Sequence, residues 1–388
     1  MKVAYILHSS GTLGGATKAL MQLVGELEQK GITPVFILPN SEGLFLELKK
    51  EGKKVYALRF YSDIYPTVGG IRSFLMFVPA VVRQVYYNRK ATAAMVDIIR
   101  NEGIQLVHSN TSIIQFAYHA ARKAGVHHVF HIREYADLDF NLHYFPSSRI
   151  VHQHLSDSYN ICITKGVQHH HGLDVISERK QSRVIYDGVL PRQSEPEYEP
   201  NGDYFLYAGR IEEAKGLDFL LQAYAAYVHQ TTQPLPLKIA GKCRRPKYMR
   251  KNKKIISQHN LQAYVEFLGP RTDILKLMSH ARATIIVSRF EGFGFCMAEA
   301  MFCGCLVVGR DTTGTHEQFE NGLAHVGHEV GLRFKTVEEL IAHLLLIGNQ
   351  TDKNFLSIRR DAFKVVNTLY TAQASAQQVY DFYQHILS

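Results

Sequence analysis

ATIIVSRFEGFGFCMAEAMFCGCLVV, residues 283–308, decides the fold that we expect for this chain of 388 residues. Its apolar and β-branched start predicts a buried strand, its glycines break the pattern, and a run of small apolar residues predicts a helix before a second apolar strand. Such an order is typical of a parallel α/β sheet. Ligands bind these sheets at the loops beyond the carboxyl ends of the strands. We therefore expect a ligand site at the glycine-broken loop.

The backbone of this loop predicts an anion site. Gly292 and Gly294 let the chain approach a ligand closely, because they carry no side chain. The amides near Phe293 and Phe295, at the start of the helix, are then placed to donate to a negatively charged group such as a diphosphate.

Two glutamates predict a ligand that also carries hydroxyl groups. Glu291 stands in the loop and Glu299 on the helix. Ionised carboxylates are unsuited to phosphate but accept charge-assisted hydrogen bonds from sugar hydroxyls. The alternative for either residue alone is a solvated loop glutamate or a helix-start glutamate that the helix dipole favours. Together with the glycines, the pair favours a sugar-nucleotide site.

The segment resembles the signature of the retaining glycosyltransferases of family 4, also called glycosyl transferases group 1. That signature places two glutamates, separated by seven residues, inside EGFG…EAM…G, which here runs from Glu291 to Gly304. Leu306 stands where the family usually has a proline. The resemblance implies the GT-B fold: two facing Rossmann-like α/β domains, a cleft between them, and a last helix that returns to the first domain. It also implies that Glu299 holds the ribose and Glu291 the donor sugar.

A second motif supplies positive charge. DYFLYAGRIEEAKGLDFLLQAY puts Gly209 and Arg210 at a strand end and Lys215 before a helix, which resembles the GR…KG motif of the family. A guanidinium forks onto diphosphate oxygens and an ammonium adds a point charge, so both would stabilise a leaving diphosphate. Taken alone, these cations would be ordinary surface charges.

A looser match follows downstream. TTGTHEQFENG resembles the GG-x-x-E loop of the family, with Thr313 at the place of its first glycine. Gly314 and Thr315 would offer backbone amides to the diphosphate. The alternative is a turn followed by a helix start.

The amino-terminal half has its own glycine loop, MKVAYILHSSGTLGGATKAL, in which a strand leads to Gly14 and Gly15. The spacing differs from the GxGxxG of dinucleotide enzymes, which weakens an oxidoreductase interpretation. The matching loop of the family faces donor phosphate and acceptor, so the resemblance implies donor binding at these two glycines.

Polar residues also follow two predicted strands of this half. IQLVHSNTS places His108 and Asn110 at one strand end, and HHVFHIREYADLD places His131, Arg133 and Glu134 at the next. By position, His131 resembles the histidine that relatives place beside the transferred sugar. The sequence HIRE resembles a motif that is common in family members that act in bacterial surface-polysaccharide synthesis. We assign the other four residues to acceptor binding. A single histidine at a strand end can equally be structural.

Length and composition fit two domains. With 46% hydrophobic and 20% charged residues, the chain can bury substantial cores. A stretch rich in Pro and Glu at 190–202 predicts the linker. We expect an acceptor-binding domain over 1–189, completed by a returning helix at about 366–388, and a nucleotide-sugar-binding domain over 203–365.

A net charge of +9 gathers partly in two runs. Lys242–Lys254 is one, and Arg72–Arg100, where apolar and basic residues mix, is the other. Either predicts an anionic membrane surface as a partner, and a solvated face is the alternative. No nucleic-acid-binding motif accompanies the charge, so we expect no nucleic-acid partner.

Other features bear on location. The longest apolar stretch, Phe74–Val82, has nine residues against about 20 for a membrane span. The start lacks a signal-peptide pattern. Five cysteines, an odd number, argue against a disulfide framework. We expect a cytoplasmic protein, peripheral on the inner face of the membrane if the basic runs bind lipid.

No metal site is expected. His169, His170 and His171 are consecutive and point in different directions, so they cannot close a tetrahedral site alone. Asp137 and Asp139 approach the DxD pattern of metal-dependent enzymes, but the resemblance implies metal-independent transfer without a cofactor.

The resulting hypothesis is a retaining glycosyltransferase that moves a sugar from a nucleoside diphosphate to a saccharide or lipid-linked saccharide acceptor, in which Arg210, Lys215, Glu291 and His131 do the catalytic work. The resemblance implies same-face attack. The alternatives are an epimerase or phosphorylase on the same fold, or a catalytically silent subunit that binds a membrane or a partner.

Overall fold

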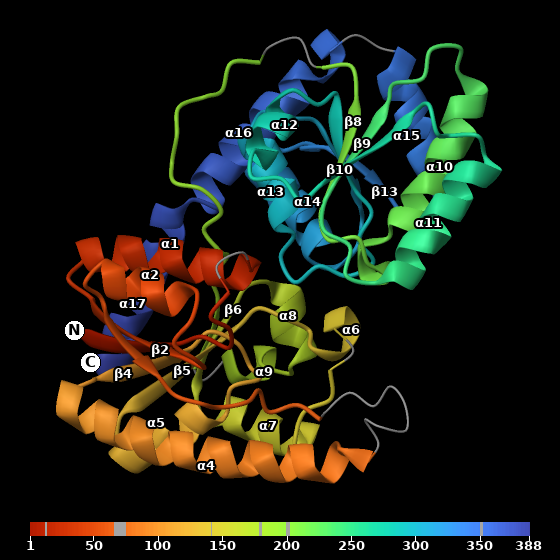
Figure 1. Ribbon diagram of the computed structural model, residues 1–388. Coiled ribbons are helices and arrows are strands. Elements are labelled where there is room, and N and C mark those ends of the chain that lie inside the picture. The colour runs from red at the N-terminus through yellow and green to blue at the C-terminus, as the bar shows by residue number, and fades with distance from the viewer. Residues whose placement is uncertain (12–13, 66–74, 141, 178–180, 199–201, 350–351) are drawn as a thin grey trace. The chain divides into compact units, whose positions relative to one another are not determined.

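The computed structural model describes residues 1–11, 14–65, 75–140, 142–177, 181–198, 202–349 and 352–388. It divides into two compact units, which we call the first domain (Met1–Gly188 with Ala372–Ser388) and the second domain (Val189–Thr371). Figure 1 shows the elements of each. Part of the predicted linker, residues 199–201, lies outside the described residues.

The first domain is built on a parallel sheet of seven strands in the order β3-β2-β1-β4-β5-β6-β7. Its inner strands are almost continuously buried, because helices cover both faces of a parallel sheet, whereas the edge strands β3 and β7 are only partly buried. The strands are β1 (Lys2–Ile6), β2 (Thr33–Leu38), β3 (Lys54–Ala57), β4 (Leu106–Ser109), β5 (His127–Ile132), β6 (Tyr159–Cys162) and β7 (Ser182–Val184).

Helices form a layer on each face of this sheet (Figure 1). One apolar core joins β1 and β2 to α1, α2 and α17, and another lies between the sheet and α4 and α5. The helices are α1 (Gly15–Gln29), α2 (Leu44–Lys50), α4 (Phe77–Glu102), α5 (Phe116–Ala124), α6 (Asp137–Phe140), α7 (Ser148–Ser156), α8 (Lys165–His170), α9 (Asp174–Ser177) and α17 (Ala372–Leu387).

The last helix returns to the first domain, as expected. Phe382 and Tyr383 of α17 are fully buried in the core shared with α1. Polar contacts reinforce this packing, since Lys30 Nζ donates to Gln377 Oε1 at 2.6 Å. The predicted helical stretch is two helices in the structure, because α16 belongs to the second domain and ends before Tyr370.

The second domain repeats the plan with a parallel sheet of six strands, in the order β10-β9-β8-β11-β12-β13. The strands are β8 (Phe205–Ala208), β9 (Leu237–Ala240), β10 (Val265–Gly269), β11 (Ala283–Ile286), β12 (Val307–Arg310) and β13 (Leu332–Phe334). The helices are η1 (Glu213–Lys215), α10 (Leu217–Gln230), α11 (Pro246–Gln258), α12 (Ile274–Ser279), α13 (Phe295–Phe302), α14 (Thr313–Val326), α15 (Val337–Asn349), η2 (Asp352–Phe355) and α16 (Leu356–Leu369).

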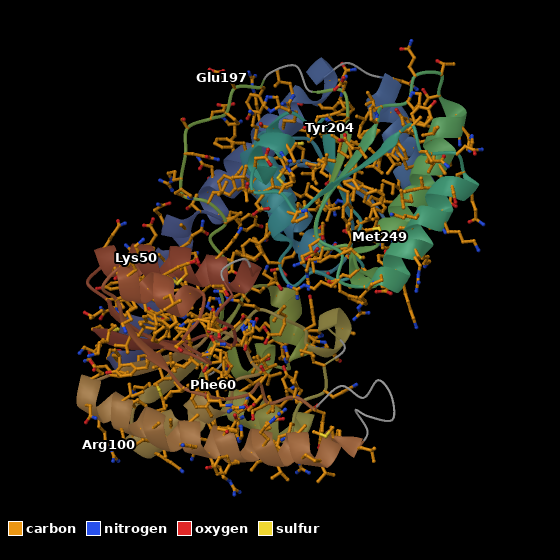
Figure 2. The ribbon with its side chains drawn as sticks, viewed as in Figure 1. Lys50, Phe60, Arg100, Glu197, Tyr204 and Met249 are labelled. Atoms are coloured by element: carbon orange, nitrogen blue, oxygen red, sulfur yellow. The ribbon has the colours of Figure 1, made fainter. Side chains whose placement is uncertain are left out.

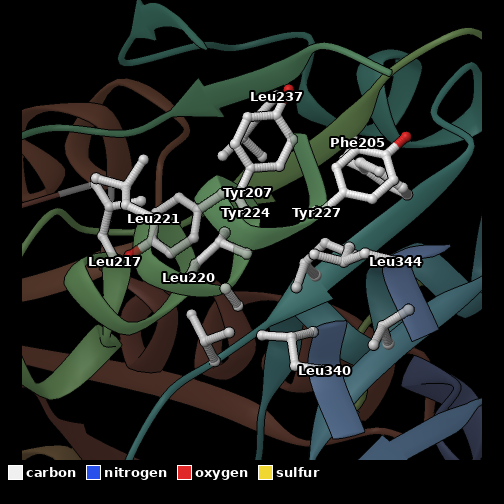
Figure 3. Packing of buried hydrophobic residues seen from close by; sticks show 14 of the residues in the cluster. Phe205, Tyr207, Leu217, Leu220, Leu221, Tyr224, Tyr227, Leu237, Leu340 and Leu344 are labelled. Carbon is white, nitrogen blue, oxygen red and sulfur yellow. The ribbon is translucent and has the colours of Figure 1, made fainter. Parts of the chain in front are cut away.

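An apolar cluster lies under α10 and α15 in this domain. Figure 3 shows Leu217, Leu220 and Leu221 of α10 facing Leu340 and Leu344 of α15, all fully buried. Each leucine of this kind stabilises the fold by about 1.5–3 kcal/mol. The side chains drawn in Figure 2 fill the space between sheet and helices in both domains. The cores hold the strands in place. The loops that carry the sequence motifs follow the carboxyl ends of these strands.

Candidate functional site

The loop after β11 has the structure that the sequence predicts. β11 lies between β8 and β12, and α13 begins at Phe295 and carries Glu299 on its second turn. Gly294 is the N-cap of α13 in a left-handed conformation with φ of +96° and provides no side-chain cap. The first turn of α13 therefore starts without a capping side chain, as an anion site at a helix start requires.

This loop is fastened to α14 by hydrogen bonds on both sides of Glu291. The amide of Glu291 donates to Thr313 Oγ1 at 2.9 Å, and the amide of Gly314 donates to the Glu291 carbonyl at 2.9 Å. Gln318 Nε2 donates to the carbonyl of Phe293 at 2.7 Å. The backbone of Glu291 is thus fixed, and only its side chain can change position.

Gly314 is needed because the two loops approach so closely. A Cβ there would lie 2.6–2.8 Å from the carbonyl oxygens of Glu291, Gly292 and Phe293. In this structure the Gly314 amide, which the sequence analysis assigns to the diphosphate, donates to the Glu291 carbonyl, so donor binding by Gly314 remains a prediction. The amide of Thr315 is also used, since it donates to the carbonyl of Thr312 at 3.1 Å. These two residues support the loop and do not offer free amides to a ligand.

The GR…KG loop lies directly against the loop after β11. The amide of Arg289 donates to the carbonyl of Ala214 at 2.9 Å, and a Cβ on Gly216 would lie 2.4 Å from the Val287 carbonyl oxygen. This contact brings the two motifs together. Lys215 Nζ lies 2.7 Å from Glu291 Oε1.

The Lys215–Glu291 pair is partly shielded from water, with side chains 19% and 15% exposed. An ion pair at this exposure is screened less than a surface pair. One oxygen of the predicted sugar-binding carboxylate is therefore occupied by the predicted diphosphate-binding cation. The sequence placed both residues in one site but did not predict that they pair.

Arg210 is more open than Lys215. Its side chain is 45% exposed, and its guanidinium lies 3.1 Å from Glu212 Oε1. The tyrosine hydroxyl of Tyr207 donates to the Arg210 carbonyl at 2.9 Å, which holds the backbone in place. The amide of Gly209 donates to the carbonyl of Ala240 within the sheet and is not free for a ligand. Any role of Gly209 in donor binding therefore comes from its lack of a side chain.

A cysteine lies beneath the same loops. Cys296 donates its thiol to the carbonyl of Ala208 at 2.9 Å. Burial, with the charges of Glu299 and Glu291 adding to it, raises the pKa of this thiol well above its usual value. The thiol stays protonated near neutral pH and is a poor nucleophile.

The predicted residues of the first domain form a buried polar cluster at the ends of β4 and β5. Arg133 is its centre: the guanidinium pairs with Asp187, and its Nε donates to Asn110 Oδ1 at 3.0 Å. Its NH2 lies 3.2 Å from His131 Nδ1. His108 Nε2 lies 3.2 Å from the same nitrogen. All five side chains are at most 8% exposed.

Burial keeps the histidines of this cluster neutral. The pKa values of His108 and His131 lie well below the usual value, first because of desolvation and then because of the Arg133 charge. Since Arg133 can only donate, His131 Nδ1 acts as the acceptor and the ring proton lies on Nε2. Burial raises the pKa of Asp187 and the guanidinium of Arg133 opposes that effect.

Two residues predicted to bind the acceptor have structural partners. His108 Nδ1 lies 2.6 Å from the hydroxyl of Tyr383 on α17. Glu134 accepts from the amide and hydroxyl of Ser112, both at 2.7 Å, and from the amide of Arg133. These contacts order the strand-end loops, and acceptor binding by His108 and Glu134 remains a prediction.

The glycine loop of the first domain joins this cluster. Gly14 is the N-cap of α1 and makes no side-chain cap, and Gly15 is the first helical residue. Asn110 Nδ2 donates to the carbonyl of Ala16 at 3.0 Å, which ties the helix start to the end of β4. Residues 12–13 lie outside the described residues.

The family model for glycosyl transferases group 1 matches residues 192–354. Over these residues the chain is therefore similar to glycosyl transferases group 1. The match covers the motif loops described above, including Arg210, Lys215, Glu291 and Glu299.

Curated relatives match part of the chain. A D-inositol 3-phosphate glycosyltransferase of Jonesia denitrificans is 32% identical over 120 residues, which make up 30% of this chain and 28% of that protein. An O-antigen chain mannosyltransferase B of Escherichia coli is 32% identical over 120 residues, 29% of this chain and 30% of that protein. The similarity thus spans less than a third of either relative.

Solved structures match the whole chain. Anabaena HepE, in complex with UDP, superposes with a TM-score of 0.77 at 18% identity, over 99% of this chain and 100% of that one. A glycosyltransferase from Rickettsia africae gives a TM-score of 0.75 at 18% identity, over 100% and 98% of the chains. At these identities the likeness concerns the fold, and it confirms the expected GT-B class with two Rossmann-like domains.

Several residues that contact the predicted site residues of each domain are not predicted from the sequence. Thr313 and Gln318 fasten the motif loop, and Asp187 pairs with Arg133. Asp187 carried a usable signal, because it directly follows the apolar run VIY at the end of β7. His8, which follows β1, is another residue that the sequence analysis does not name. Burial and, to a smaller extent, the charge of Arg133 lower the pKa of His8.

The three consecutive histidines contact three different groups. His169 faces Asp174 at 2.8 Å, His170 faces Asp137 at 2.8 Å, and His171 Nε2 lies 3.0 Å from the Glu134 carbonyl. The side chain of Asp139 lies outside the described residues. Within the described ranges, no group of three or more His, Cys, Asp or Glu residues is arranged to hold a metal ion.

Two further findings concern the cysteines and the helices. Its five cysteines are free: Cys162, Cys243, Cys296, Cys303 and Cys305. Among the residues that the structure describes, no helix is both long enough and apolar enough to span a bilayer.

Proposed function

We propose that this chain is a retaining glycosyltransferase that moves a sugar from a nucleoside-diphosphate sugar to a hydroxyl of a saccharide acceptor. The contact between Lys215 and Glu291 carries the proposal. It joins a cation and a carboxylate beside the uncapped start of α13. A sugar diphosphate presents phosphate oxygens and hydroxyls close together, and it needs these three kinds of group.

Donor binding would change the partners of this pair. The diphosphate would take the ammonium of Lys215 and the guanidinium of Arg210, and Glu291 would turn its released oxygen to the hydroxyls of the donor sugar. Because the backbone of Glu291 is held by Thr313 and Gly314, this exchange needs only side-chain motion. Glu299 would hold the ribose.

Bond breaking would then depend on electrostatics. As the bond between sugar and phosphate breaks, negative charge grows on the diphosphate, and Arg210 and Lys215 stabilise it. We propose attack from the same face, with the leaving phosphate accepting the proton of the acceptor hydroxyl. In the first domain, neutral His131 is suited to hydrogen bonding with a sugar and unsuited to carrying charge. Cations and amides would replace a metal ion.

The relatives support the substrate class and setting of this proposal. One is an O-antigen chain mannosyltransferase and another a D-inositol 3-phosphate glycosyltransferase. The fold relative from Anabaena was solved with UDP and glucose. We propose a cytoplasmic enzyme of cell-surface polysaccharide or glycoconjugate synthesis.

Donor turnover tests the proposal. The purified chain is incubated with UDP-glucose, UDP-galactose, UDP-N-acetylglucosamine, GDP-mannose and ADP-glucose, and released nucleoside diphosphate is measured with and without saccharide acceptors. At least one donor should be consumed, equally in EDTA and in magnesium. NMR of the first-formed product should show the anomeric configuration of the donor.

Two of the alternatives, a silent subunit and an epimerase, each predict a different outcome. Donor binding without turnover, whatever acceptor is present, would indicate a silent binding subunit. Conversion of one nucleotide sugar into another would indicate an epimerase. An inverted product, or loss of turnover in EDTA, would contradict the retaining or the metal-independent part of the proposal.

A further inference from the structure

The helix α4 carries an apolar stripe on its outer face. Val78, Val82 and Tyr86 follow one another at intervals of four residues, and their side chains are 67%, 61% and 59% exposed. Leu75, just before the helix, is 69% exposed. This interval keeps the residues on one side of a helix. The opposite side, with Gln84, Asn88 and Met95, is buried.

Cations continue the same face. Arg89 and Lys90 are exposed and come one turn after Tyr86. A shallow groove joins the two kinds of residue and is lined by Val81, Val82, Val85, Tyr86, Arg89 and Lys90. We call Leu75, Val78, Val82, Tyr86, Arg89 and Lys90 the outer face of α4. In Figure 1, α4 (orange) runs along the rim of the first domain.

Aromatic and basic side chains flank this face. The guanidinium of Arg59 lies 4.2 Å from the centre of the Tyr87 ring, and that of Arg83 lies 5.2 Å from the centre of the Tyr61 ring. Tyrosine and arginine each combine an apolar body with a polar end, which suits the boundary between water and lipid.

The other basic run of the chain differs in this respect. On α11, the apolar side chains Tyr248, Ile255 and Ile256 are buried in the core of the second domain. Two of the cations in the run are paired with acids, Arg245 with Glu213 at 3.2 Å and Lys251 with Asp218 at 2.7 Å. The run on α11 is therefore a solvated basic face. Only α4, of these two, combines exposed apolar groups with cations.

We propose that the outer face of α4 docks this chain onto a bilayer that contains anionic phospholipid. Apolar side chains would enter the headgroup region, and the cations would meet phosphates. This inference is independent of the sugar-transfer reaction, because none of its residues belongs to the motif loops.

Charge favours a lipid surface over a second copy of the chain. The first acidic residue of α4 is Asp97, near its end, and Glu102 is paired with Lys54 at 2.9 Å. Two copies of the outer face would place cations against cations, which opposes association. A bilayer with anionic phospholipid offers phosphates to the cations and an apolar interior to the apolar stripe.

Vesicle co-sedimentation of the full chain tests the proposal. Vesicles of phosphatidylcholine alone are compared with vesicles that also contain phosphatidylglycerol, at low and high salt. Three variants are used: V78S/V82S/Y86S for the apolar stripe, R89E/K90E for the cations, and K253E/K254E on α11 as the control. The control also reverses two adjacent exposed lysines on a helix and matches R89E/K90E in charge.

We expect wild type and K253E/K254E to bind anionic vesicles within about twofold of each other. R89E/K90E should lose binding by about tenfold or more, since each cation near such a surface contributes about fivefold. V78S/V82S/Y86S should lose the binding that persists at high salt. All four proteins should unfold at the same temperature and turn over donor equally, because every changed residue is exposed.

Three results would overturn the proposal. Wild type does not sediment with anionic vesicles, or K253E/K254E weakens binding as much as R89E/K90E, or V78S/V82S/Y86S binds like wild type at every salt concentration. A wild-type dimer in solution that V78S/V82S/Y86S abolishes, without vesicle binding, would assign the face to a second copy instead.

Discussion

The polar residues at the strand ends of the two domains are held in opposite ways. In the first domain Arg133, His131 and Asp187 are buried and bonded to one another. In the second domain Lys215 and Arg210 are partly exposed, and hydrogen bonds hold the loops that carry them. The first arrangement fixes side chains through other side chains, and the second fixes the backbone and leaves side chains able to exchange partners.

This difference has an energetic consequence. A buried charge that loses its partner stays buried, so its cost appears as lost stability. A partly exposed cation that is removed leaves a partner that water can still reach, so the loss should appear mainly in the binding and turnover of a ligand that needs the cation. Substitutions in the first domain should therefore affect folding, and equivalent ones in the second domain should affect turnover.

The largest effect is expected for Arg133→Met. The change leaves the carboxylate of Asp187 buried without its cation, and the free energy of unfolding should fall by about 3–5 kcal/mol. Urea unfolding measures it. Arg122→Met is the control, because its pair with Asp157 spans 3.6 Å between exposed side chains and should contribute less than about 1 kcal/mol. Equal losses for both variants would contradict the buried pair.

Lys215→Met should come next and should act on turnover. Loss of a cation that stabilises the leaving diphosphate corresponds to about 100- to 1,000-fold in kcat, or about 2.7–4 kcal/mol. Unfolding should shift little. Lys251→Met is the matched control, since it also forms a 2.7 Å pair in the second domain but lies on α11. Its rate of donor consumption should stay within about twofold of wild type. Wild-type turnover in Lys215→Met would remove the residue from the site.

Gly314→Ala tests the contact between the two loops. The new Cβ would meet three carbonyl oxygens at 2.6–2.8 Å, so the loop must shift or α14 must move, at a cost of about 1–3 kcal/mol. The melting temperature should fall and the KM for the donor should rise. Gly25→Ala is the control: it lies within α1 with no atom within 4 Å of the new Cβ and should stabilise by about 0.5–1 kcal/mol. If both variants gained stability, the close approach would be refuted.

Acid should weaken the first domain through its buried histidines. Burial lowers the pKa of His128 to about 3, from 6.5. Below pH 6.5 the unfolded chain therefore takes up a proton that the folded chain does not, and stability falls as the pH falls. Each such histidine lowers the free energy of unfolding by at most about 1.4 kcal/mol per pH unit.

Urea unfolding at pH 7.5, 6.5 and 5.5 measures this slope, and hydrogen exchange locates it. Amides of β4, β5 and β6 should lose protection as the pH falls. His128→Gln can keep a contact to Ser109, which lies 3.0 Å from His128 Nε2, but cannot titrate, so its slope should be shallower than that of wild type. Parallel slopes for the two proteins would show that His128 does not contribute.

Prediction from the sequence succeeded where the signal was local. The strand before Glu291, the helix with Glu299 and the glycine-broken loop between them follow from apolar runs and glycines within a few residues. The returning last helix also followed, through the family resemblance. Such features need no knowledge of distant partners.

Prediction failed where partners lie far apart along the chain. Lys215 and Glu291 are 76 residues apart, and Glu291 and Thr313 are 22 apart. No local pattern shows that these groups pair, and none shows that the amides of Gly314 and Thr315 donate to carbonyl groups of the protein. The two basic runs also resemble each other in sequence, because the sequence does not show which of their apolar residues are buried.

The sequence by itself determined the elements, their order and the kinds of group at each strand end, because short-range sterics and hydrophobic periodicity act within one element. The tertiary structure decided which groups are occupied and which are exposed. It paired Lys215 with Glu291, buried Arg133 against Asp187 and left the outer face of α4 uncovered. These outcomes depend on how elements pack, since hydrogen bonding and burial arise between residues that the chain brings together only on folding.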